Sequence, residues 1–200
     1  GGAGAAGVVA GENLLLRTGE TDEATASGLS LNASVSSVAG NLSVVSADGI
    51  TQGAGGYITA SGAGATVDVQ AGSWIAMADG ALTGTNNGNI RYEAAGGDVS
   101  LGELAAGTAN AVVTASGSIL DLDPDTSEVD ITAGDLILTA GSAIGEAGDH
   151  VEISAENLST ESATGSTFVH ETDSVIVTDL SVTVERVQSD MRARMLRSTD

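Results

Sequence analysis

The sequence has no cysteine and no lysine, and its 200 residues include only one proline, one tryptophan, two tyrosines and one phenylalanine. The absence of cysteine excludes a disulfide framework, a thiolate nucleophile and a zinc site with cysteine ligands. So few aromatic residues are poorly suited to filling the core of an ordinary globular domain of this length. No run approaches 18 apolar residues, so we expect no helix that spans a bilayer.

The charge is strongly one-sided, with 27 acidic residues against six arginines and a formal net charge of −21. Such a surface repels nucleic acid and anionic membranes, so we expect neither as a partner. We interpret the acidity as a source of solubility, with divalent-cation binding as the sharper alternative. Four arginines lie within the last fifteen residues, at Arg186, Arg192, Arg194 and Arg197.

A short phrase recurs along the chain: an aliphatic residue, any residue, alanine, two or three residues, and then another large apolar residue. Its copies are residues 45–50, 69–74, 113–119, 131–136 and 153–158, and residues 92–94 are a weaker copy. Their alanines are 24, 23, 21, 18 and 22 residues apart, at positions 47, 71, 94, 115, 133 and 155. A period near twenty indicates a solenoid. The alternation inside each copy indicates a strand.

These features predict an all-β fold, a parallel β-helix (β-solenoid) with coils of about 18–24 residues. Stacked rows of Val, Ile, Leu and Ala can fill its narrow interior, so we expect Ile131 to point inward and Thr132 outward. We expect residues 1–187 to form this repeat domain, as an interior fragment of a longer chain. Residues 188–200 lack glycine and are predicted to form a short basic tail, helical or irregular.

The stretch DLDPDTSE contains the one dense group of carboxylates. Its alternating Asp121, Asp123 and Asp125 resemble the opening of an EF-hand loop, in which such oxygens approach one calcium ion. The loop would need glycine where Thr126 stands and glutamate where Thr132 stands, so we do not predict an EF-hand. A looser calcium site formed by the three aspartates is the alternative to a solvated acidic turn, and we expect no other cofactor.

Histidine and asparagine offer weaker signals. His150 and His170 are separated by a coil-like interval, but without cysteine or an H-E-x-x-H helix we interpret them as solvated or packed side chains. Stacked asparagines can form hydrogen-bonded ladders along parallel coils. The turn at residues 86–89 is one asparagine cluster, which alone does not establish a ladder. Three glycosylation sequons are interpreted as chance matches, and they begin at Asn32, Asn41 and Asn157.

The run from Ile131 to Val177 resembles the repeats of filamentous-haemagglutinin-like exoproteins, the very large bacterial surface adhesins of two-partner secretion. The likeness is strongest at residues 136–145, 151–158 and 165–177, and it extends more faintly to about residue 29. It implies a right-handed β-helical shaft, exported through an outer-membrane pore and displayed at the cell surface. The secretion domain and the Asn-Pro-rich motifs of that family have no counterpart in this sequence.

Two classes of function are open. The one we favour is a non-catalytic structural and adhesive shaft segment of a secreted or cell-surface bacterial adhesin. Its partners would be neighbouring repeats of the same longer chain and a host or surface glycan or protein. The other is a β-helical polysaccharide lyase or hydrolase. A lyase needs cationic groups to neutralise a uronate, and only Arg17 and Arg91 lie outside the arginine-rich end, so we do not expect an enzyme.

Overall fold

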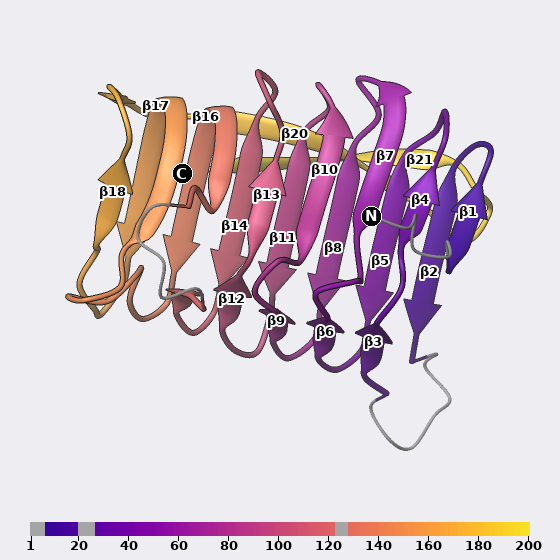
Figure 1. The fold of residues 1–200 in the computed structure, drawn as a ribbon, viewed down its shortest axis with the longest axis horizontal. Helices are drawn as coiled ribbons and strands as arrows, with labels where there is room; N and C mark the ends of the chain where they lie inside the picture. The colour runs from indigo at the N-terminus through magenta and orange to yellow at the C-terminus, as the bar shows by residue number, and fades with distance from the viewer. Residues whose placement is uncertain (1–6, 20–26, 123–127) are drawn as a thin grey trace.

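The fold is taken from a computed structural model that describes residues 7–19, 27–122 and 128–200 (Figure 1). The chain winds into a β-solenoid of about seven turns, in which strands of successive coils pair in parallel. The described residues form strands and no helix. The predicted all-β parallel β-helix is therefore confirmed.

Each coil contributes strands to three faces that run along the rod. The first face contains β1 (Val8–Ala10), β4 (Val35–Ser37), β7 (Ile58–Ala63), β10 (Leu82–Asn86) and β13 (Glu103–Ala105). The second face contains β2 (Leu14–Thr18), β5 (Leu42–Ser46), β8 (Val67–Ala71), β11 (Ile90–Ala94) and β14 (Ala111–Ala115). The third face contains β3 (Leu29–Leu31), β6 (Ile50–Gln52), β9 (Ile75–Met77), β12 (Val99–Leu101) and β15 (Ile119–Asp121).

The later coils have longer strands. β16 (Ile131–Ala140) and β17 (Val151–Ser162) each run without a break over the first and second faces. The two faces therefore join into one sheet at this end of the rod. Two short strands pair with β17 and complete the stack, namely β18 (Val169–Glu171) and β19 (Ile176–Val177).

The interior is built by alternation within each strand. Ile131 and Ala133 are buried, whereas Thr132 between them is only partly buried, as the sequence predicted. Parallel register stacks equivalent residues, so Val69 pairs with Val44 of one neighbouring coil and with Tyr92 of the other. Rows of aliphatic side chains thus extend along the axis, and each coil buries its apolar face against the next.

The aromatic residues take two different places. Tyr92 is fully buried, and its hydroxyl makes hydrogen bonds of 2.6 Å with the Thr83 hydroxyl and 2.9 Å with Gln52 Oε1. Trp74 is 44% exposed and lies over Gly49 of the preceding coil, where an added Cβ would come within 2.4 Å of the indole ring. Glycine is required at that position, because any side chain there would collide with the packed indole ring of Trp74.

The repeated phrase occurs on two faces, which its spacing in the sequence did not reveal. Residues 131–133 lie on the first face, whereas residues 113–115 lie on the second face. The partner of residues 113–115 in the next coil is the segment 138–140. The short interval between the alanines at 115 and 133 therefore compares positions on different faces.

The coils are also longer than expected near the start of the chain. The register places Leu42 beside Leu14, and this offset is wider than the longest coil that the repeated phrase predicted. The copy assigned to residue 45 is displaced by one position, because Val44 rather than Val45 pairs with Val69. Turn length varies between coils without disturbing the strands, so a fixed period aligns them only approximately.

A ladder of polar side chains runs along the corner between the first and second faces. Its members are Asn13, Asn41, Thr66, Asn89, Asn110, Asp135 and Asn157. Asn13 Oδ1 accepts a bond of 2.8 Å from the backbone N–H of Asn41, whose own Oδ1 accepts one of 2.8 Å from the N–H of Thr66. The asparagines of the sequons at 41 and 157 thus have a structural role in the rod.

The end of the chain differs from the prediction. The segment 188–200, expected to be helical or irregular, contains the strand β21 (Ala193–Thr199), which pairs antiparallel with β20 (Ser181–Val187). The residues of β21 favour a helix by composition, but the backbone pairing with β20 overrides that weak preference. We call this hairpin, residues 181–199, the clasp, and it also crosses the expected domain boundary after Val187.

The clasp lies along the rod, across the outer side of the second face (Figure 1). Val182 packs against Val112 and Ile137 in one buried cluster. The N–H of Val187 donates to Ser43 Oγ at 2.8 Å on β5, several coils away. The hairpin therefore contacts coils that do not touch one another.

A buried ion pair also attaches the clasp. Asp68 on β8 is fully buried, and its carboxylate binds Arg186 Nε of the clasp at 2.5 Å and Arg91 Nη1 of the next coil at 2.7 Å. Arg91 also pairs with Glu93. One arginine near the end of the chain thus pairs with an acidic residue of the rod.

Candidate cation-binding site

Three buried carboxylates meet at the corner between the third and first faces. Asp121 is the last residue of β15, Asp130 precedes β16, and Glu152 is the second residue of β17. They are 6%, 6% and 2% exposed, respectively. One oxygen from each side chain lies within 4.8 Å of an oxygen from each of the others.

The register of the coils brings two of these residues together. Ile131 pairs with Ile153, so the residues before them, Asp130 and Glu152, occupy equivalent positions in adjacent coils. The same column continues to Glu103 in the preceding coil and to His170 in the following one. Coils are about 4.8 Å apart, and like charges in adjacent positions of a sheet repel each other.

Hydrogen bonds hold part of the cluster in place. Asp130 Oδ2 accepts a bond of 2.8 Å from the backbone N–H of Glu152, and the side chains of Asp130 and Asp121 are also hydrogen bonded. Glu152 Oε1 is buried, yet it has no hydrogen-bond donor among the described residues. A buried polar atom without a partner is costly, so this oxygen marks a place where a ligand would be stabilising.

Burial and mutual repulsion favour the neutral forms of these acids. The pKa of Asp130 is raised to about 8, chiefly by burial; the N–H of Glu152 acts in the opposite direction, and the carboxylates of Asp121 and Glu152 contribute to the rise. Burial, followed by the charge of Asp121, raises the pKa of Glu152 as well. The cluster therefore requires a proton or a cation to neutralise part of its charge.

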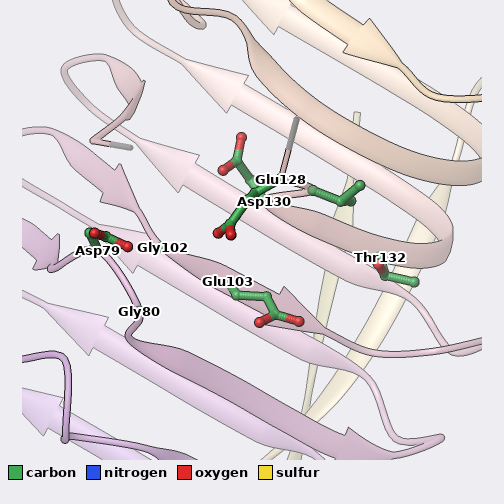
Figure 2. A pocket seen from close by; sticks show the side chains of 8 residues that line it. Asp79, Gly80, Gly102, Glu103, Glu128, Asp130 and Thr132 are labelled. Atoms are coloured by element: carbon green, nitrogen blue, oxygen red, sulfur yellow. The ribbon is translucent and has the colours of Figure 1, made fainter. Parts of the chain in front are cut away.

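A surface pocket of about 320 Å³ lies beside the cluster and shares Asp130 with it. Figure 2 shows the carboxyl groups of Asp79, Glu103, Glu128 and Asp130 around this pocket. Its other lining residues are Gly80, Gly102, Val129 and Thr132. Acidic side chains from three successive coils thus surround a hollow that is open to solvent.

The structure describes only one of the three calcium ligands predicted from the sequence. Asp121 belongs to the cluster, whereas Asp123 and Asp125 lie outside the described residues. Asp130 and Glu152 were missed, although each directly precedes the aliphatic residue that opens a copy of the phrase. The sequence signal was a carboxylate repeated at the same position of two copies. It indicates a cluster only when the two copies are known to lie side by side in adjacent coils.

The two histidines lie near the cluster. The ring of His150 stacks on Phe168, with centroids 5.9 Å apart and an interplanar angle of 22°, which agrees with a packed side chain. His170 is exposed and pairs in the parallel register with Glu152. Both lower the pKa of Glu152, but less than burial raises it.

The fold defines this chain as a β-solenoid repeat protein. Comparisons with family models, with curated proteins and with solved structures give no match to it. Within residues 7–19, 27–122 and 128–200, no helix has the length and apolar character needed to cross a membrane.

Proposed function

We propose that this chain is a shaft segment of a bacterial surface adhesin of the filamentous-haemagglutinin-like kind, with a structural and adhesive role outside the cell and no catalytic role. The observation that carries the proposal is the continuous parallel register of the coils, from β1 through to β18 and β19. About seven coils at about 4.8 Å each give a rigid length of roughly 30–35 Å.

Two features that run along the axis support a shaft. The ladder of polar side chains ties most coils to a neighbour at one corner, and the clasp contacts several coils at once along the second face. Both resist separation of the coils rather than shaping a recess for a substrate. The proposed partners are neighbouring repeats of the same longer chain, together with a glycan or protein on a host or another surface.

The test is an in-register deletion of one coil. Ile90 pairs with Ala111, so removing residues 91–111 joins Ile90 to Val112 and leaves every later side chain on its original side. A shaft segment should then still fold and become shorter by about 4.8 Å, as measured by X-ray scattering. The matched control removes residues 91–112, which places Thr114 inward in the joined strand and should impair folding.

A second candidate function is a β-helical polysaccharide hydrolase or lyase. The pocket in Figure 2 favours the hydrolase, because glycoside hydrolysis uses a pair of carboxylates and this pocket has several. The intact chain should be incubated with uronate polymers and with neutral polysaccharides while product formation is followed. Turnover that is lost in Glu103→Gln, in a chain that still folds, would replace the shaft proposal with an enzyme.

A further inference from the structure

The carboxylate cluster holds more negative charge than its surroundings easily support. Asp121, Asp130 and Glu152 are each more than nine-tenths buried, and one oxygen from each lies within 4.8 Å of the others. Carboxylates packed at this distance cannot all stay ionised without a compensating cation. The third acid of the column, Glu103, lies in the neighbouring coil and adds to the negative potential.

A second observation indicates that the cluster binds a ligand, rather than remaining buried without one. Glu152 is 2% exposed, and its Oε1 atom is buried without a hydrogen-bond partner among the described residues. Buried polar atoms are almost always partnered, so an unpartnered carboxylate oxygen beside two other carboxylates is unusual. A cation bound between the three side chains would supply the missing partner and neutralise the charge together.

We propose that Asp121, Asp130 and Glu152 bind one divalent cation, and that calcium fits the site best. Calcium lies about 2.3–2.6 Å from its oxygen ligands, so oxygens on opposite sides of the ion are about 5 Å apart. The three carboxylate oxygens lie within 4.8 Å of one another, so they are close enough to contact one such ion together. Magnesium lies about 2.0–2.1 Å from its ligands and usually keeps several waters, which suits three buried side chains less well.

The proposed ion would join separate parts of the rod. Asp121 ends a strand of the third face, whereas Asp130 and Glu152 belong to adjacent coils at the start of the first face. Binding would therefore hold the end of β15 and the starts of β16 and β17 in one fixed arrangement. The proposal is independent of the shaft function, because such a site would stabilise a β-solenoid of any role.

The experiment is a calcium titration of the full chain after treatment with EDTA, by calorimetry and by thermal unfolding at constant ionic strength. We expect one saturable site, with a dissociation constant on the order of 10⁻⁴ to 10⁻³ M, as in extracellular calcium modules. Ten millimolar calcium should raise Tm by about 5–10 °C through mass action on the folded state. Magnesium at the same concentration should give a clearly smaller shift.

Two variants distinguish calcium bound at this site from calcium that only screens the net negative charge of the protein. Glu152→Gln should abolish the calcium-dependent rise in Tm, and in EDTA it should be at least as stable as the parent because one of three crowded charges is gone. Asp130→Asn is the second test of the cluster and should also lose the rise. Glu103→Gln is the control, because it removes an equal charge from the same column outside the cluster, and it should keep the full rise.

The proposal would be overturned by either of two results. One is that the parent chain shows no calcium heat and no shift in Tm. The other is that Glu152→Gln and Glu103→Gln respond to calcium equally, since this would mean that calcium only screens the net charge. If calcium has no effect and Glu152→Gln is simply more stable in every buffer, the cluster holds a shared proton rather than a metal ion.

Discussion

The attachment of the clasp through Asp68 gives a quantitative test of the structure. The side chain of Asp68 is fully buried and contacts two guanidinium groups, those of Arg91 and Arg186, which are 13% and 19% exposed. In Asp68→Asn, Arg91 retains its pairing with Glu93, but Arg186 loses its carboxylate partner. Nη2 of Arg186 is already buried without an acceptor in the described part of the chain, so little remains to stabilise this charge.

Removing one member of a buried ion pair costs about 3–5 kcal/mol, because the partner charge is left uncompensated. We take the lower end, about 3 kcal/mol, because Arg186 keeps some contact with water. With a urea m-value of about 2–3 kcal/mol per molar, the midpoint of unfolding should fall by about 1–1.5 M. The double variant Asp68→Asn with Arg186→Met should recover part of this loss, since it leaves no unpaired charge.

Trypsin makes the assay specific to the clasp. The chain has no lysine, so trypsin can cut only after its six arginines, and four of these are at Arg186 or later. Asp68→Asn should speed cleavage after Arg186 much more than cleavage after Arg91, which lies within the coils. Glu93→Gln is the matched control: it removes another carboxylate that pairs with Arg91 but leaves the contact between Asp68 and Arg186 in place, so cleavage after Arg186 should not change. A midpoint shift in Asp68→Asn of less than about 0.3 M, the size expected of a surface ion pair, would refute the reasoning.

Three further predictions concern other layers of the fold. Ile131→Asp should cost several kcal/mol in chemical denaturation by burying an unpaired charge, whereas Thr132→Asp should cost under about 0.5 kcal/mol, and equal shifts would contradict the inward assignment. Asn110→Leu should cost about 1–3 kcal/mol by leaving the N–H of Asp135 without its acceptor, and a neutral result would remove the ladder from the list of stabilising features. Folding raises the pKa of Asp130 to about 8, so between pH about 4 and 8 the folded state holds a proton that the unfolded state has lost. In EDTA, stability should therefore fall as pH rises through this range, by at most about 1.4 kcal/mol per unit, and Asp130→Asn should flatten that slope in urea midpoints compared across pH.

Local features of the chain could be predicted from the sequence because they depend on neighbouring residues. Alternation of Ile131 with Thr132 determines which side chain points inward, and that requires knowledge of one strand only. The same is true of the strand at Val182 and Val184, which are buried as their alternation with polar residues suggests. Fold class followed from such local patterns together with their recurrence.

Contacts between coils were harder to predict because they depend on coil length. Asp130 and Glu152 are 22 residues apart, and they meet only because no insertion lies between their two strands. The offset is larger where Leu42 pairs with Leu14, so a fixed period gives the wrong neighbours there. The position of the clasp could not be predicted from the sequence for another reason. The clasp packs on the outward side of the second face, and in the sequence Asp68 and Ser43 look like ordinary solvent-facing polar residues of that side.

The clasp has a consequence for how the rod would carry a pulling force. Along the axis, the coils are joined in series, so a load is limited by the weakest interface between two neighbours and the stack can unzip from one end. The backbone of β20 runs in the same direction as the load and is anchored to β5 through Val187 and to β14 and β16 through Val182. The covalent backbone of β20 therefore carries part of the pulling force alongside the interfaces between neighbouring coils. To separate the coils between these anchors, the buried contacts of the hairpin must also be sheared, at both ends of the strand at once.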